Sequence, residues 1–132
     1  MLFAIIAGFV AMSALSGLWH MAVMADFYAT DRPTVAFAEP KMQFILLGYF
    51  ILALLMAYIY PLGYKGGSSV IEGLKFGVLI GLLWILPEAV VLFGVFESSG
   101  TVLVVDAIWH LVEQGLGGIV VGLVYGSGVA AE

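Results

Sequence analysis

Residues 102–126, VLVVDAIWHLVEQGLGGIVVGLVYG, decide the fold because they combine a long apolar run with a face of polar side chains and a row of glycines. The run exceeds the roughly 20 residues that an α-helix needs to cross the hydrocarbon core of a bilayer. Asp106, His110, Glu113 and Gln114 recur at the spacing of one helix face. The segment therefore predicts a membrane-spanning helix whose polar face points away from lipid.

Three further apolar segments, at roughly 2–25, 42–62 and 71–96, are also long enough to cross a bilayer. Hydrophobic residues make up 64% of the 132-residue chain, charged residues make up 10%, and the mean hydropathy is +1.18, unlike soluble domains. Short connections make successive helices antiparallel neighbours. We therefore predict an all-α polytopic membrane protein, a single domain over residues 1–132 with four transmembrane helices in an antiparallel up-down-up-down bundle.

The predicted connections place both termini on one side of the membrane. The first connection, from Asp26 to Lys41, holds two prolines and is expected to be an ordered turn or an extended crossing rather than helix. The second connection is glycine-rich, and the third is the shortest. Both termini then lie on the side of the second connection. Lysine and arginine divide two and two between the sides, while acids gather on the side of the first connection. This distribution favours cytoplasmic termini.

Composition also excludes several classes of protein and site. The chain has no cysteine, which excludes disulfides, thiolate metal sites, iron–sulfur clusters and c-type haem attachment. It has only four lysines and arginines, a net charge of −5 and no basic cluster, so the sequence gives no support for nucleic-acid binding. No nucleophile–base–acid constellation appears outside the intramembrane polar residues, which argues against an enzyme.

Two rows of glycines predict where the helices pack most closely. Small residues four apart let membrane helices approach each other, and van der Waals contact then holds them. In the antiparallel bundle both rows fall in the half of the bilayer nearer the second connection. They serve contacts within the chain or with another subunit. The predicted packing residues are Gly73, Gly77 and Gly81 in the third segment and Gly118, Gly122 and Gly126 in the fourth.

Ionisable side chains collect in the other half. His20 lies near the end of the first segment, Glu88 about two turns from the end of the third, and His110 about two turns into the fourth. Because successive helices alternate in direction, these residues reach similar depths. Ionisable groups are costly in hydrocarbon, so they mark a candidate site. The predicted ligand or proton pathway comprises His20, Glu88, Asp106, His110, Glu113 and Gln114 with the tryptophans Trp19, Trp84 and Trp109.

This set of side chains suits more than one chemistry. Two imidazoles and two carboxylates, from His20, His110, Glu88 and Glu113, suit a divalent metal such as zinc, iron or manganese. Two facing histidines suit a b-type haem. Buried carboxylates and histidines also relay protons, and an acidic, aromatic-lined cavity receives an amine or an amphiphile. Polar contacts that only join helices need no ligand.

Two short motifs carry a resemblance. SGLWH at 16–20 closes the first segment, and IEGLKFG at 71–77 opens the third. The chain resembles an uncharacterised family of small bacterial four-helix membrane proteins, in which Gly-x-Trp-Tyr ends the first helix and Glu-Gly-Leu opens the third. His20 stands where that pattern has tyrosine. The resemblance implies the four-helix topology and a bacterial inner membrane, and it brings no activity.

Two functions from different classes remain. The sequence favours a structural or accessory membrane subunit that contacts lipid and is held by glycine packing and buried polar pairs, as a homo-oligomer or part of a larger complex. The alternative is a bundle that handles a ligand, a metal or haem, or protons, for transport or binding. That alternative centres on His20, Glu88, His110 and Glu113.

Overall fold

The computed structural model describes residues 1–30, 40–95 and 99–129, and the described residues are helical with no strand. The elements, in chain order, are α1 (Leu2–Leu18), the π-helix η1 (Trp19–Val23), α2 (Ala25–Thr30), α3 (Met42–Gly63), α4 (Ser69–Val95) and α5 (Gly100–Val129). The all-α prediction is confirmed.

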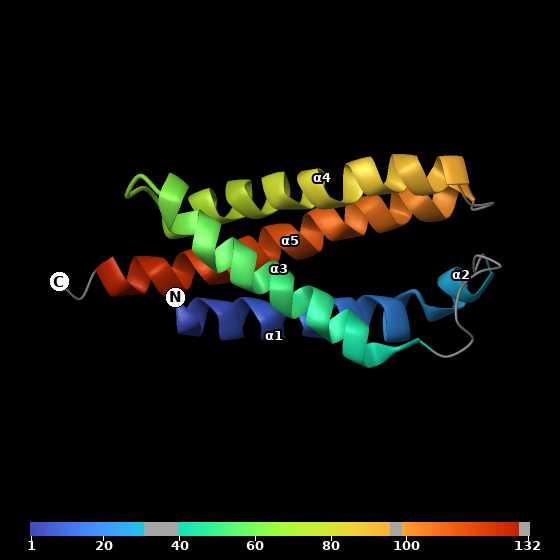
Figure 1. The fold of residues 1–132 in the computed structure, drawn as a ribbon, viewed down its shortest axis with the longest axis horizontal. Coiled ribbons are helices and arrows are strands. Elements are labelled where there is room, and N and C mark those ends of the chain that lie inside the picture. Colours follow the sequence, from blue (N-terminus) through green and yellow to red (C-terminus); the bar gives the residue numbers. More distant parts are fainter. Residues whose placement is uncertain (31–39, 96–98, 130–132) are drawn as a thin grey trace.

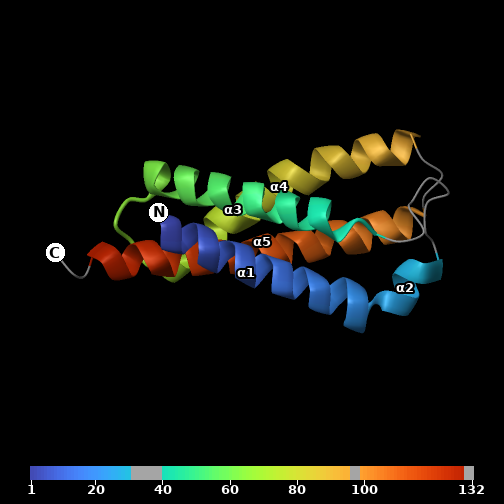
Figure 2. The same cartoon turned by 60° about the horizontal axis from the view of Figure 1, so that its bottom comes forward.

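The four long helices alternate in direction. The N terminus, the α3–α4 turn and the end of α5 lie at one end of the bundle, and α2 lies at the other (Figure 1). Helix α5 contacts α1, α3 and α4, whereas α4 packs mainly on α5 (Figure 2). The predicted antiparallel bundle is therefore confirmed, with α5 as its central helix.

Four helical stretches are long and apolar enough to cross a membrane. They are Leu2–Val23, Met42–Gly63, Ser69–Val95 and Gly100–Gly126. Each stretch exposes large apolar side chains on its outer face. A helix satisfies its own backbone hydrogen bonds, which is what hydrocarbon requires of a spanning segment. These features indicate an integral membrane protein.

The helices extend into the predicted connections: α4 begins at Ser69 instead of residue 71, and helix also forms in the first connection and at the start of α5. The prediction of an ordered turn or extended crossing rather than helix from Asp26 is wrong at its start, because Ala25–Thr30 forms helix α2. The rest of that connection, residues 31–39, lies outside the described residues. Helix α5 begins at Gly100, where the Thr101 N–H donates to the Ser99 hydroxyl at 3.2 Å. Such a hydroxyl satisfies a helix-start amide that has no intrahelical acceptor.

Glycines form the contact between α4 and α5. A Cβ atom at Gly77 would overlap the backbone of Gln114, and one at Gly118 would overlap the backbone of Gly73. Backbones this close leave no room for a side chain, which is the small-residue packing of membrane helices. The structure places all six glycines of the two rows against the opposite helix, namely Gly73, Gly77, Gly81, Gly118, Gly122 and Gly126.

The remaining core lies between α1, α3 and α5. Met12 of α1, Met56 of α3 and Val121 of α5 are fully buried. Gly117 of α5 makes space for Met12, whose Sδ lies 2.7 Å from the position that a Gly117 Cβ would take. The half of the bundle nearer the termini is therefore closed by apolar and backbone contacts.

We predict that Gly77→Ala destabilises the protein by about 1–3 kcal/mol, because the added methyl forces α4 away from the Gln114 carbonyl. The matched control is Gly94→Ala on the same helix, since a Cβ there meets nothing within 4 Å. Unfolding by SDS in mixed micelles, followed by circular dichroism, measures both. Equal stability of the two variants would contradict the glycine contact.

Candidate functional site

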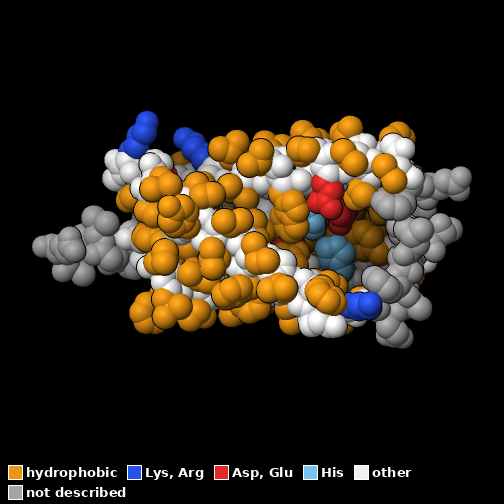
Figure 3. Space-filling model, in the orientation of Figure 1, with side chains coloured by type: hydrophobic (Ala, Val, Ile, Leu, Met, Phe, Trp, Pro, Cys, Tyr) orange, Lys and Arg blue, Asp and Glu red, His pale blue; other side chains and the backbone are white. Residues whose placement is uncertain are grey.

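A group of hydrogen-bonding side chains, here the polar cluster, lies in the half of the bundle nearer α2. Figure 3 shows a recess between apolar surfaces in this half, with histidine side chains inside it and acidic side chains at its edge. The side chains of the cluster come from α1, η1, α2, α3 and α5, so the bundle assembles the cluster from sequence-distant parts. Its members are Ser16, His20, Tyr28, Tyr49, Asp106, His110, Glu113 and Gln114.

The π-helix η1 sets the positions of Trp19 and His20. The Met24 N–H donates to the Trp19 carbonyl at 2.8 Å, a bond that spans five residues instead of four. Such a wide turn changes which side chains face the bundle, and π-turns recur at functional sites. Here Trp19 stacks flat on Trp109 of α5, with ring centroids 4.3 Å apart and planes 3° from parallel.

His20 and Asp106 form the outer part of the cluster. The Nδ1 atom of His20 lies 3.0 Å from the Ser16 carbonyl oxygen, and its Nε2 atom lies 3.2 Å from Oδ1 of Asp106. A carbonyl oxygen only accepts, so Nδ1 carries a proton. The Nε2 contact then also needs a proton, on His20 or on Asp106. The two side chains therefore form a proton-sharing pair that joins η1 to α5.

Tyr28 of α2 extends this pair toward the membrane surface. Its hydroxyl donates to Oδ1 of Asp106 at 3.0 Å and accepts from Nε1 of Trp19 at 3.0 Å. Burial raises the pKa of Tyr28 to about 12, and the nearby Asp106 carboxylate adds to the increase. The hydroxyl therefore stays protonated and remains a donor to Asp106 at physiological pH.

Glu113 forms the inner part and is fully buried, with an exposed fraction of 0%. The Tyr49 hydroxyl lies 3.2 Å from its Oε2, and Nε2 of Gln114 donates to its Oε1 at 3.2 Å. Glu113 lies halfway along the Gly100–Gly126 span, roughly 20 Å from either end at the helical rise. A carboxyl group at that depth is costly unless it is paired.

Ser16 and Tyr49 connect the two parts. The Tyr49 hydroxyl lies 2.8 Å from Oγ of Ser16, and that Oγ lies 3.4 Å from Nδ1 of His20. Because a phenol has one proton, Tyr49 donates either to Ser16 or to Glu113. Hydrogen-bonding contacts thus run without a break from Asp106 to Glu113.

Aromatic rings enclose the inner part. Trp84 of α4 stacks on His110, with centroids 5.1 Å apart and planes 19° from parallel. The Tyr49 ring contacts the indole of Trp84 edge-on, with the two ring centroids 6.2 Å apart. Together with the Trp19–Trp109 stack, these rings give the cluster an aromatic wall.

Two buried polar atoms of the cluster have no hydrogen-bond partner among the described residues. They are Nδ1 of His110 and Oε1 of Gln114. The nearest charged group to that His110 nitrogen is Oε2 of Glu113, at 3.9 Å, which is too far for a hydrogen bond. Buried polar atoms are normally paired, and each unpaired one costs about 1–3 kcal/mol. The inner end of the cluster therefore keeps unused hydrogen-bonding capacity.

Glu88 is a predicted site residue that does not join the hydrogen bonds of the cluster. Its side chain is exposed, and it forms no hydrogen bond or ion pair with the described residues. Helices that pack along an i, i+4 row bury every fourth residue. The buried row of α4 runs through Gly81 and Ile85, so its next member is Ala89. Glu88 lies one residue off that row.

Sequence reasoning did not select Ser16 and Tyr28. The available signal for Ser16 was its position four residues before His20, which places both on one helix face. Tyr28 had no such signal, because it falls in a connection for which the sequence predicts a turn or extended crossing rather than helix.

The described residues give no support to the predicted metal site. Among the residues that the structure describes, no group of three or more histidine and acidic side chains could hold a metal ion. The predicted ligands His20, His110, Glu88 and Glu113 therefore have no support as a metal set. The imidazole Nε2 atoms of His20 and His110 both face the Asp106 carboxylate, at 3.2 and 4.0 Å.

Fold and cluster together define a small α-helical integral membrane protein with a buried acidic and aromatic site. No family model, curated protein or solved structure matches the chain. The predicted resemblance to a bacterial four-helix family therefore gains no support beyond the shared membrane topology.

We predict that Asp106→Asn lowers the free energy of unfolding by about 1–3 kcal/mol, because it weakens charge-assisted contacts to His20 and Tyr28. Glu88→Gln removes an acid from an exposed position and is expected not to lower stability. SDS titration of both variants in mixed micelles provides the comparison. If only Glu88→Gln lowered the stability, the stabilising polar contacts would involve Glu88 and not Asp106.

Proposed function

We propose that this protein is a membrane-embedded binding protein whose polar cluster takes up an amine. The observation that carries the proposal is the fully buried Glu113 beside the unpartnered carbonyl oxygen of Gln114. Both groups accept hydrogen bonds, and an ammonium group brings three donors and a compensating charge. An amine at this position would complete the pairing of the inner part of the cluster.

The charges and rings around Glu113 suit a cation. The cluster contains two carboxyl groups, and their charged partners in the structure are the two histidines. The indole of Trp84 and the ring of Tyr49 flank the same region. Aromatic faces attract cations by about 0.5–2 kcal/mol, more when water is excluded. Acidic and aromatic groups therefore favour the same class of ligand.

The shape of the bundle favours binding over passage through the membrane. The polar cluster extends from the α2 end to the middle of α5, while the half nearer the termini is closed by glycine contacts and by the buried Met12 and Met56. The polar region therefore has a blind inner end. A site of this kind holds a ligand without offering a continuous polar route for it.

A structural or accessory role is the second candidate. The Tyr49–Ser16 contact joins α3 to α1, and the His20–Asp106 pair joins η1 to α5. Such contacts fix the relative positions of helices without any ligand, as polar side chains do in other membrane bundles. In this case the protein would serve as a rigid subunit of a homo-oligomer or a larger complex.

Titration with butylamine separates the two candidates. We expect a saturable change in tryptophan fluorescence of the detergent-purified protein, and a fall in affinity of about tenfold or more in Glu113→Gln, because an amide cannot offer the ionic contact. Glu72→Gln is the matched control. It makes the same chemical change outside the cluster, because Glu72 accepts hydrogen bonds from the backbone N–H groups of Lys65 and Gly67 in the α3–α4 turn. An identical response of wild type and Glu113→Gln would rule out the amine site and leave the structural role.

A further inference from the structure

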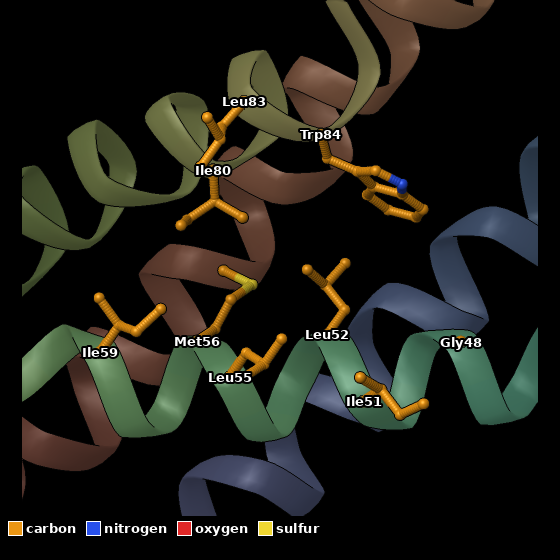
Figure 4. Close-up of a pocket in the computed structure, with 9 residues that line it drawn as sticks. All are labelled: Gly48, Ile51, Leu52, Leu55, Met56, Ile59, Ile80, Leu83 and Trp84. Carbon is orange, nitrogen blue, oxygen red and sulfur yellow. The ribbon is translucent and has the colours of Figure 1, made fainter. Parts of the chain in front are cut away.

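An apolar groove lies between α3 and α4, beside the polar cluster. Its cavity volume is about 400 Å³. Figure 4 shows side chains of the two helices facing each other across it, with the Trp84 indole toward the Gly48 end. Every residue of the lining is apolar or glycine, namely Gly48, Ile51, Leu52, Leu55, Met56, Ile59, Ile80, Leu83 and Trp84.

The packing of the bundle explains why this groove exists. The glycine rows draw α4 onto α5, and α3 packs mainly on α1, so α3 and α4 make few contacts with each other. Gly48 widens the groove at one end, where a Cβ atom would meet nothing within 4 Å. The space is therefore a product of the helix arrangement and of a missing side chain.

The Gly48 end of the groove adjoins the polar cluster. Trp84 lines the groove and also stacks on His110, with ring centroids 5.1 Å apart. Tyr49 follows Gly48 on α3, and its hydroxyl lies 3.2 Å from Oε2 of Glu113. Trp84 and Tyr49 therefore stand between the groove and the fully buried Glu113, and a head group reaches that carboxyl group from the groove when these side chains move aside.

We infer that the ligand is a single-chain amphiphilic amine, with its ammonium head at Glu113 and its hydrocarbon chain in the α3–α4 groove. The inference rests on the proposed amine site and adds the nature of the rest of the ligand. From Gly48 to Ile59 the groove follows α3 for roughly 16 Å, enough for a chain of about a dozen carbons. The occupant is an amine because the buried carboxyl group of Glu113 lies beyond the Gly48 and Trp84 end of this apolar groove.

The test uses 12-bromododecylamine, whose bromine quenches tryptophan fluorescence, with 12-bromododecanoic acid as the head-group control. We expect saturable quenching of the detergent-purified protein by the amine, at a concentration about tenfold lower than for the acid. Gly48→Leu places a side chain in the open end of the groove and should weaken amine binding by about tenfold, the effect of displacing two buried methylenes. Gly94→Leu fills open space elsewhere on α4 and should leave the binding unchanged.

The outcomes separate this inference from the proposed function. If butylamine binding depends on Glu113 but Gly48→Leu binds the long amine as wild type does, the chain does not lie in the groove and only the inference falls. If neither amine responds to Glu113→Gln, both the amine site and the inference fall. Equal quenching by amine and acid in all variants would show that the probes only partition into the detergent micelle, which also overturns the inference.

Discussion

The pairing of buried polar groups without water is the constraint on which this structure depends. Helix α5 carries Asp106, His110, Glu113 and Gln114 into a part of the bilayer where only protein groups can satisfy them. Side chains of α1, η1, α2 and α3 therefore have to meet α5 at those positions, which makes α5 the central helix. Lipid accepts the remaining faces because they are apolar.

The same helix divides the bundle into two unlike halves. Toward the termini α5 presents glycines, so α4 approaches until backbones touch, as Gly77 does against Gln114. Toward α2 it presents polar side chains, which contact η1, α2 and α3, and the His110 ring, which stacks on Trp84 of α4. Because α4 packs mainly on α5, it makes few contacts with α3, and the small groove beside Trp84 lies between α3 and α4.

Sequence alone predicted what depends on helical period and membrane thickness, namely the four spans and their alternating direction. The expectation that His20 and His110 share one depth follows from the same arithmetic, and their ring centroids lie 6.4 Å apart. What the sequence could not give depends on tertiary contact. The π-helix at Trp19 contains no proline or glycine from which it could be predicted. It occurs where Trp19 stacks on Trp109 of another helix. The position of Glu88 depends on which row of α4 residues packs against α5. The sequence pattern of α4 alone does not specify that row.

The depth of Glu113 weighs against the view that the cluster only joins helices. Apolar residues of similar size replace buried polar groups without loss of stability in many proteins, so a carboxyl group at mid-membrane is a costly way to hold helices together. This bundle also holds helices together without buried charge, since glycines bring the backbones of α4 and α5 into contact. The outer pair, His20 and Asp106, is partnered within the chain, whereas the inner end keeps an unused acceptor on Gln114. An unpaired hydrogen-bond acceptor at the most buried point does not help to hold helices together. A binding site, in contrast, requires an acceptor that is free to pair with the ligand.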